Sequence, residues 1–178
     1  MNKTGIKKIC LVAAFAAIMA ALAQIAIPTP LGVSLTLQTF AIALAAFLLG
    51  AKLGAAATLC YIALGAAGVP VFAGFASGLG VILGPSGGFI FAFPVFAVLL
   101  SFAFYVNKSI AKIALCMSAL IVLYLAGIIQ FIIVSGSSVK VAIVTFLLYF
   151  VKDTLVVAAA YFLCGRIRKS AVKFMQSK

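Results

Sequence analysis

Long apolar runs separated by short polar breaks dominate this chain of 178 residues. A membrane-spanning helix needs about 20 mostly apolar residues, and the pattern contains six runs near that length, of which the second is short. Their approximate ranges are 9–27, 35–50, 53–69, 88–106, 110–134 and 141–164. The predicted fold is therefore an all-α membrane protein, a six-transmembrane-helix bundle that forms a single integral membrane domain over residues 1–178.

The composition supports a membrane protein. Hydrophobic residues make up 67% of the chain and charged residues 8%, and the mean hydropathy is +1.41. A soluble domain of this length needs many more polar side chains to cover its surface. We therefore expect a multi-pass integral membrane protein surrounded by a lipid bilayer.

Basic residues lie at the ends of the apolar runs, so they test the predicted topology. The chain has 13 lysines and arginines but one acidic residue, for a formal charge of +12. Loops rich in lysine and arginine stay in the cytoplasm, and here they predict that both termini are cytoplasmic. This placement is typical of topology signals rather than of a nucleic-acid-binding patch, so no nucleic acid partner is expected. The residues on the predicted cytoplasmic side are Lys3, Lys7, Lys8, Lys52, Lys108, Lys112, Arg166, Arg168, Lys169, Lys173 and Lys178, whereas Lys140 lies on the other side and Lys152 lies within the last helix.

The inventory of reactive side chains argues against an enzyme. Without histidine and with a single carboxylate, the chain cannot build a general acid/base pair, a carboxylate–histidine metal site or a Ser-His-Asp triad. Its cysteines are far apart, and no P-loop pattern is present. A serine–lysine nucleophile stays open, although no local signature supports it. No catalytic residue, metal site or cofactor is predicted.

Asp153, the lone acid, lies near the middle of the sixth apolar run. A charge at that depth costs about 2.5–3.5 kcal/mol on insertion scales, so its side chain should face the protein interior or a wet cavity. It either makes a structural contact between helices or accepts hydrogen bonds from a ligand. Adjacent helical residues point about 100° apart, so we expect that Lys152 does not pair with it directly; Lys152 either snorkels or binds an anionic group.

Two further segments are candidates for a binding site. Residues 61–91 are too rich in glycine and proline for a plain helix and carry interleaved aromatic residues. Irregular backbone at membrane depth is tolerated only where protein buries it or it lines a cavity; the alternative is an ordinary surface loop. Residues 33–42 add the polar side chains of Ser34, Thr36, Gln38 and Thr39. With Asp153, these segments could form one outward-facing pocket with aromatic walls.

The first predicted helix carries a stripe of small residues. Ala13, Ala17 and Ala21 recur every four residues, and small side chains let another helix approach closely. The stripe is either an interface or a consequence of the abundance of alanine in membrane helices. The basic start, apolar run and "ALA" at 21–23 also imitate a signal peptide, an interpretation that the stripe disfavours.

At these residues the sequence resembles the BioY family, the biotin-specific substrate-capture (S) components of energy-coupling factor (ECF) transporters. The matching pieces are "PTPLGVSLTLQTFAIALAAFLLG" (28–50), "LGAAGVPVFAGFASGLGVILGPSGGF" (64–89) and the single aspartate of the last helix. The resemblance implies a six-helix bundle that binds biotin in an outward pocket. It also implies an ECF transmembrane coupling subunit and an ATPase pair as partners, with Ala13, Ala17 and Ala21 contacting the coupling subunit.

Residue by residue, the resemblance implies that Asp153 accepts hydrogen bonds from the ureido N–H groups of biotin. Some family members carry asparagine where Gly74 stands, which leaves the partner of the ureido carbonyl open, and Ser86 stands where threonine is usual. Two other functions stay possible: a solitary biotin carrier, and a membrane scaffold without a small ligand. The residues implied to bind biotin are Asp153, Gln38, Tyr61, Phe72, Gly74, Phe75, Gly87, Phe89 and Tyr149.

Overall fold

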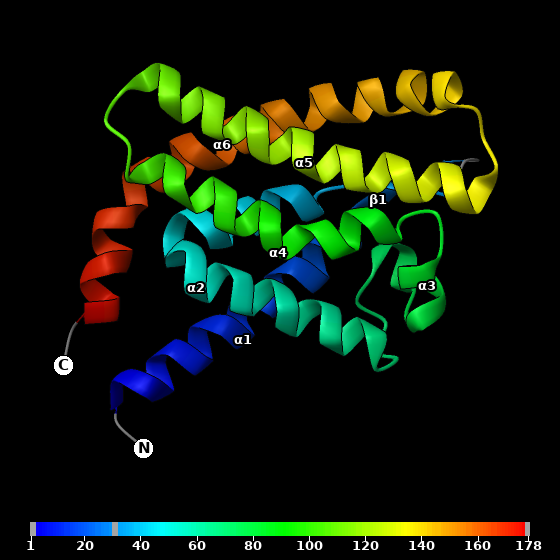
Figure 1. Cartoon of the computed structure of the whole chain (residues 1–178). Coiled ribbons are helices and arrows are strands. Elements are labelled where there is room, and N and C mark those ends of the chain that lie inside the picture. The colour runs from blue at the N-terminus through cyan, green and yellow to red at the C-terminus, as the bar shows by residue number, and fades with distance from the viewer. Residues whose placement is uncertain (1–2, 30–31, 177–178) are drawn as a thin grey trace.

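The computed structural model describes the backbone of residues 3–29 and 32–176 and the side chains of residues 5–29 and 32–167. Its architecture is a bundle of long helices (Figure 1). Two 3-10 turns, η1 (Ala73–Phe75) and η2 (Phe102–Phe104), and two strands, β1 (Ala26–Ile27) and β2 (Leu35–Thr36), complete the described elements. The helices are α1 (Lys3–Ala23), α2 (Gln38–Ala66), α3 (Leu79–Leu83), α4 (Gly87–Ser101), α5 (Ser109–Ser135) and α6 (Val139–Gln176).

Gly50 divides α2 into two helical halves. Its backbone has φ 78° and ψ −179°, a conformation that is essentially restricted to glycine. A Cβ placed on Gly54 would lie 3.2 Å from Cα of Ala46, whereas residues eight apart in a straight helix are separated by about 12 Å. The halves 38–49 and 51–66 therefore fold back on each other as a hairpin with a one-residue corner.

Within the described residues, five stretches are long and apolar enough to cross a membrane, which confirms the prediction of an all-helical membrane protein. They are Gly5–Ala23, Gln38–Ala66, Gly87–Phe104, Ser109–Ser135 and Val139–Ile167. The predicted runs 35–50 and 53–69 both fall in the second stretch, because the chain resumes its helix directly after Gly50. The first helix ends at Ala23 rather than at 27, since Ala26 and Ile27 pair antiparallel with Thr36 and Leu35.

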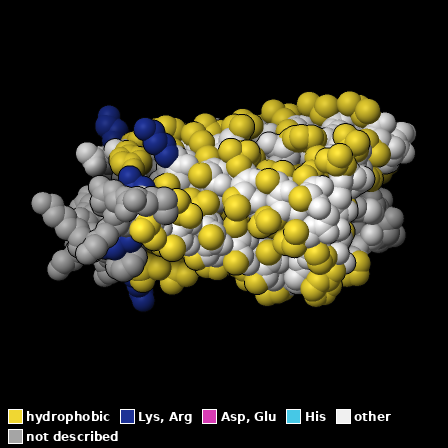
Figure 2. Space-filling view, turned by 90° about the horizontal axis from the view of Figure 1, so that it is seen from below, with side chains coloured by type: hydrophobic (Ala, Val, Ile, Leu, Met, Phe, Trp, Pro, Cys, Tyr) yellow, Lys and Arg dark blue, Asp and Glu magenta, His cyan; other side chains and the backbone are white. Residues whose placement is uncertain are grey.

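The first half of α2 is the centre of the bundle. Ile42 and Phe47 are fully buried there, and α2 packs against α1, α4 and α6 while α5 packs against α4 and α6. The outer surface is apolar (Figure 2), with 67% of Leu155 and 75% of Ile133 exposed. Such an outer face suits lipid rather than water.

The two ends of the bundle differ in charge and in structure. We call them the basic end, where both termini and the turn from α4 to α5 lie, and the loop end, where residues 24–29, 32–37, 67–86 and 136–138 lie (Figure 1). Gly50 belongs to the basic end, because a Cβ placed on it would lie 3.4 Å from the hydroxyl of Tyr105 in that turn. The lysines and arginines visible in Figure 2 gather at the basic end. The side chains of Lys3, Arg168, Lys169, Lys173 and Lys178, and the residue Pro30, lie outside the described part of the chain.

Candidate functional site

A cavity of about 260 Å³ lies among the segments of the loop end. Its lining comes from residues 32–39, from residues 72–86 and from inward-facing side chains of α4, α5 and α6. The two candidate segments predicted from the sequence therefore meet at one cavity, and Asp153 lies in its wall. The glycine-rich segment contains η1 and α3 rather than a plain helix or an ordinary surface loop.

Asp153 is 5% exposed and is held by three donors. The Thr39 hydroxyl donates to Oδ1 over 2.5 Å, and the Tyr124 hydroxyl donates to Oδ2 over 2.7 Å. The ammonium of Lys152 lies 2.6 Å from Oδ1. Because α2, α5 and α6 each contribute a partner, the carboxylate joins three helices at the cavity wall, and its charge is compensated where it is buried.

The expectation that Lys152 and Asp153 do not pair was wrong. Their Cα–Cβ directions do diverge along the helix, but the four-carbon stem of lysine is long enough to bring the ammonium back to the carboxylate. Lys152 Nζ also donates to the carbonyl oxygen of Thr36 over 2.6 Å, and its side chain is 22% exposed. Lys152 therefore connects α6 to β2 and lines the cavity.

Gln38 is the centre of a second polar group on the cavity wall. Its Nε2 donates to the Tyr61 hydroxyl over 2.6 Å, and that hydroxyl donates to the carbonyl of Val71 over 3.1 Å. The Thr36 hydroxyl donates to Oε1 of Gln38 over 2.9 Å. The amide is therefore fixed on one side by Thr36 of β2 and on the other by Tyr61, which the α2 hairpin brings back to the start of the helix.

Aromatic rings form the apolar part of the wall. Phe89 and Tyr124 meet edge to face with centroids 5.4 Å apart, and Phe72 meets Tyr61 in the same way at 5.6 Å. A Cβ on Gly127 would come within 2.3 Å of the Phe89 ring. Because Gly127 has no side chain, the Phe89 ring can pack directly against the backbone of α5, and it stays in the cavity wall.

Tyr149 joins the wall to the loop between β1 and β2. Its hydroxyl lies 2.8 Å from the carbonyl oxygen of Val33 and 3.1 Å from Oγ1 of Thr29. The Thr29 hydroxyl itself donates to the Val33 carbonyl over 2.8 Å. This loop is thus tied to α6 on the same side as Asp153.

The structure brings some predicted site residues to the cavity and leaves others outside its lining. Asp153, Gln38, Phe72, Phe89 and Tyr149 line it. Tyr61, Gly74, Phe75 and Gly87 do not: Tyr61 is fully buried behind Gln38, and 70% of Phe75 is exposed. Gly74 has a φ of +67° with open space around it, and Gly87 packs against the carbonyl of Ile82.

The alanine stripe predicted on the first helix lies on the outer side of α1. Ala13, Ala17 and Ala21 are exposed, whereas Ala16 and Met19 are buried against the bundle. Small side chains on an uncovered helix face leave room for a close helix–helix approach. The described part of the chain leaves this face of α1 uncovered.

Sequence reasoning missed three polar side chains around the cavity: Tyr124, Gln24 and Gln130. Tyr124 lies within the predicted apolar run 110–134, where nothing in the sequence separates it from the other apolar and aromatic residues. The chain has four glutamines, and Gln24, Gln38 and Gln130 all contact the cavity lining or the loops that carry it. A search for amides within apolar runs would have found them, because a buried amide needs partners.

The arrangement is suited to binding a ligand that is partly polar and partly apolar. One wall offers a carboxylate, an ammonium, an amide and hydroxyls, and the other walls offer flat apolar rings. Among the described side chains, no group of three potential metal ligands occurs. A ligand with both N–H donors and acceptors on a partly apolar body matches this distribution of groups.

Comparisons with known proteins agree with the sequence resemblance. The profile of the BioY family matches residues 1–173. The chain is 42% identical over 124 residues to the probable biotin transporter BioY of Pyrococcus horikoshii, covering 68% of this chain and 72% of that protein. It is 43% identical over 108 residues to the biotin transporter BioY2 of Lactococcus lactis subsp. cremoris, covering 61% and 59%.

A solved structure shares the fold. The S-component for biotin from an ECF-type ABC transporter superposes with a TM-score of 0.84 over 95% of this chain and 94% of that one, at 24% identity. At this identity the likeness establishes the architecture alone. The five apolar stretches and the family profile together make the chain a multi-pass membrane protein. The match over residues 1–173, nearly the whole sequence, shows that this chain belongs to the BioY family.

Proposed function

We propose that this protein is the biotin-capturing subunit of an ECF-type uptake transporter in a bacterial cell membrane. The observation that carries the proposal is the family match over residues 1–173, since a family of transporters is recognised along the whole bundle rather than in one motif. The names of the relatives, which are biotin transporters, point to the same ligand. The mixed polar and aromatic cavity supplies a site of suitable chemistry.

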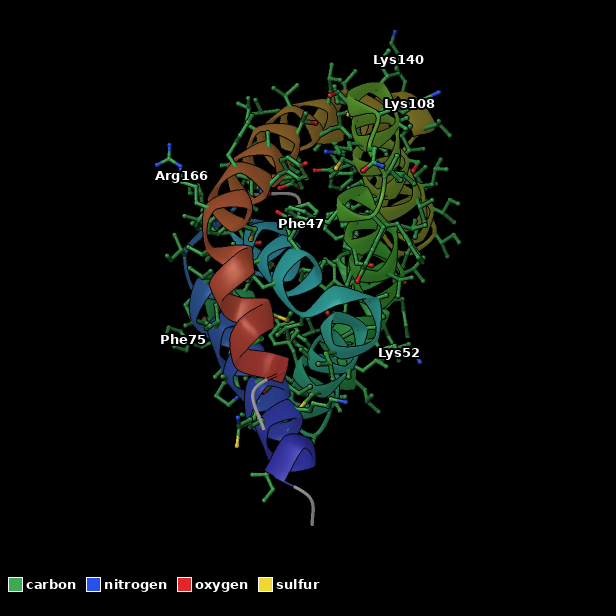
Figure 3. The ribbon with its side chains drawn as sticks, turned by 90° about the vertical axis from the view of Figure 1, so that its left-hand side faces the viewer. Phe47, Lys52, Phe75, Lys108, Lys140 and Arg166 are labelled. Atoms are coloured by element: carbon green, nitrogen blue, oxygen red, sulfur yellow. The ribbon has the colours of Figure 1, made fainter. Side chains whose placement is uncertain are left out.

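The proposed topology has six crossings, with both termini in the cytoplasm and the cavity facing outward. The hairpin at Gly50 supports it, because its halves supply two crossings within the single stretch Gln38–Ala66. The concentration of basic residues at the end that holds the termini supports the orientation. Lys140, labelled in Figure 3, is the second residue of α6, and α6 begins at the opposite end, the loop end (Figure 1).

Within the cavity, the proposed roles follow from the donors and acceptors already placed. A carboxylate offers about four acceptor positions, of which three are used by Thr39, Tyr124 and Lys152, so Asp153 can still accept from a ureido N–H. Lys152 and Gln38 supply N–H donors on the same wall. Phe72 and Phe89 provide apolar faces for the ring carbons of the ligand.

Energy for transport must come from other proteins in this proposal. The sequence has no P-loop pattern, so ATP hydrolysis is assigned to an ATPase pair that acts through a transmembrane coupling subunit. The exposed stripe Ala13, Ala17 and Ala21 is the proposed contact for that subunit. Ala17→Leu should then abolish copurification of the coupling subunit. Biotin uptake by the lone chain in vesicles without ATPases would instead establish a solitary carrier.

The decisive experiment is equilibrium binding of biotin to the purified chain in detergent, compared with Asp153→Asn. We expect binding by the wild type and a loss of at least about tenfold, or about 1.4 kcal/mol, in the variant. Thr154→Val is the matched control, because the neighbouring hydroxyl bonds only the Phe150 carbonyl of its own helix over 2.8 Å. A folded wild type that binds no biotin would refute the proposal and favour a scaffold; unchanged binding by Asp153→Asn would make that residue structural.

A further inference from the structure

Two glutamine side chains hold the connection between α2 and α4, which forms one side of the cavity. From the end of α1, Nε2 of Gln24 lies 3.3 Å from the carbonyl oxygen of Val71 and 3.1 Å from that of Phe72. From α5, Nε2 of Gln130 donates to the carbonyl of Ile82 over 2.9 Å. Residues 73–81 run between these two attachment points, and several of them line the cavity.

The Gln130 attachment is reinforced by close backbone packing. A Cβ on Gly87 would meet the carbonyl oxygen of Ile82 at 1.7 Å, and one on Gly88 would meet that of Ala126 at 2.2 Å. Contacts this close require the backbones of α4, α5 and the end of α3 to stay in register. We therefore regard the Gln130 side as the fixed end of the connection.

The Gln24 attachment has little packing of this kind. Side chains added at Gly74, Gly78 or Gly80 would meet nothing within 4 Å, and 70% of Phe75 is exposed. Val71 and Phe72 are buried, and Ala76 packs against the core, so packing anchors the two ends of this part. Residues 73–75 between them are held by backbone and amide hydrogen bonds.

Phe75 shows that the Gln24 contact holds an unfavourable conformation. Its φ of +59° is the only positive φ outside glycine in the described part of the chain, and side-chain-bearing residues seldom adopt it. The Phe75 N–H donates to Oε1 of Gln24 over 2.8 Å. The same amide therefore accepts from one residue of η1 and donates to the carbonyls just before it.

We propose that Gln24 is a positioning residue that latches residues 73–80 over the cavity and so sets how fast ligand enters and leaves. The inference rests on the proposed function, since it assigns the latch to the biotin site. Opening this segment requires the Gln24 hydrogen bonds to break, while the Gln130 end stays in place. Because Gln24 directly follows the last residue of α1, a displacement of α1 would pull on the latch.

The test compares the wild type with Gln24→Met, which keeps the length and apolar stem of the side chain but loses the amide. Two measurements are made: stopped-flow rates of biotin association and dissociation, and amide hydrogen exchange over residues 72–76 without ligand. The loss of the hydrogen bonds is expected to raise both the dissociation rate and the exchange rate of the Phe75 amide by about tenfold. Ser118→Ala is the control, because that exposed hydroxyl bonds only the Leu115 carbonyl of its own helix.

The outcomes separate the latch from the proposed function. If the biotin rates and the Phe75 amide exchange of folded Gln24→Met stay within about twofold of the wild type, the latch is overturned. Absence of biotin binding by the wild type would instead overturn the proposed function. In that case the exchange measurement still decides whether Gln24 holds the segment. If Gln24→Met does not fold, Gln24→Glu replaces it, since that side chain keeps an oxygen for the Phe75 N–H but loses the amide donor. Faster biotin dissociation with Phe75 still protected would then support the latch, and unchanged dissociation would overturn it.

Discussion

Replacing both members of the buried ion pair should cost less than the sum of the two single replacements. Asp153 Oδ1 and Lys152 Nζ lie 2.6 Å apart, and the two side chains are 7% and 22% exposed. Because bulk water reaches them only in part, each charge depends mainly on the other for its compensation. Asp153→Asn leaves an ammonium with the Thr36 carbonyl as its partner. Lys152→Met leaves a carboxylate with two hydroxyl donors, whereas the double variant leaves no charge.

The magnitude follows from the contacts. Hydrogen bonds to charged groups contribute about 1.5–3 kcal/mol, and removing one partner of a fully buried pair costs about 3–5 kcal/mol. Because Lys152 is partly exposed, we expect less than the cost for a fully buried pair and take a value within the first range, about 2 kcal/mol for each single variant. The double variant should also cost about 2 kcal/mol, which gives a coupling free energy of about 2 kcal/mol.

The assay is reversible unfolding of the detergent-solubilised protein by a denaturing detergent. The chain has no tryptophan, so loss of helicity followed by far-ultraviolet circular dichroism is the appropriate signal. Thr154→Val, one position further along α6, should change the free energy of unfolding by less than about 0.5 kcal/mol. If the effects of Asp153→Asn and Lys152→Met add to within about 0.5 kcal/mol, the two charges do not stabilise each other and the reasoning fails.

Two other predictions concern the cavity wall and the topology. Gly127→Ala should destabilise the fold by about 1–3 kcal/mol and weaken biotin binding, because the added Cβ would overlap the Phe89 ring at 2.3 Å. Gly165→Ala is the control: nothing lies within 4 Å of its added Cβ, so stability and biotin binding should each change by less than about 1 kcal/mol. Equal effects of the two variants would contradict this account. In a chain whose native cysteines are replaced by alanine, Ser138→Cys should react with a membrane-impermeant maleimide in intact cells and Asn107→Cys should not. The reverse pattern would invert the proposed orientation.

The sequence was sufficient to predict the class of fold and the inward position of Asp153. An acid in an apolar run has few alternatives, because exposure to lipid is too costly. The break between the predicted runs 35–50 and 53–69 was also predicted, although its corner is a single residue, Gly50. A glycine can reverse the chain direction without leaving a visible polar loop.

The partners of Asp153 could not be predicted, because they depend on how three helices are rotated about their axes. Thr39 and Tyr124 are 114 and 29 residues away along the chain, and no local pattern relates them. Lys152 was misjudged for a different reason: backbone directions were considered without the reach of the side chain. The role of Gln24 could not be predicted, because its hydrogen-bond acceptors are backbone carbonyls, and every residue carries one.

The position of the ion pair within a single helix bears on how the protein is made. A separate lysine and aspartate would each cost about 2.5–3.5 kcal/mol when α6 enters the bilayer. Lys152 and Asp153 are neighbours in sequence, and their 2.6 Å contact involves no other segment. The pair can therefore form as soon as α6 is helical, before α2 and α5 provide Thr39 and Tyr124. On this view the central part of α6, residues 141–165, in which Lys152 and Asp153 are the charged residues, enters the membrane as a nearly neutral segment. Assembly of the bundle then only completes the hydrogen bonds around a charge that was already compensated.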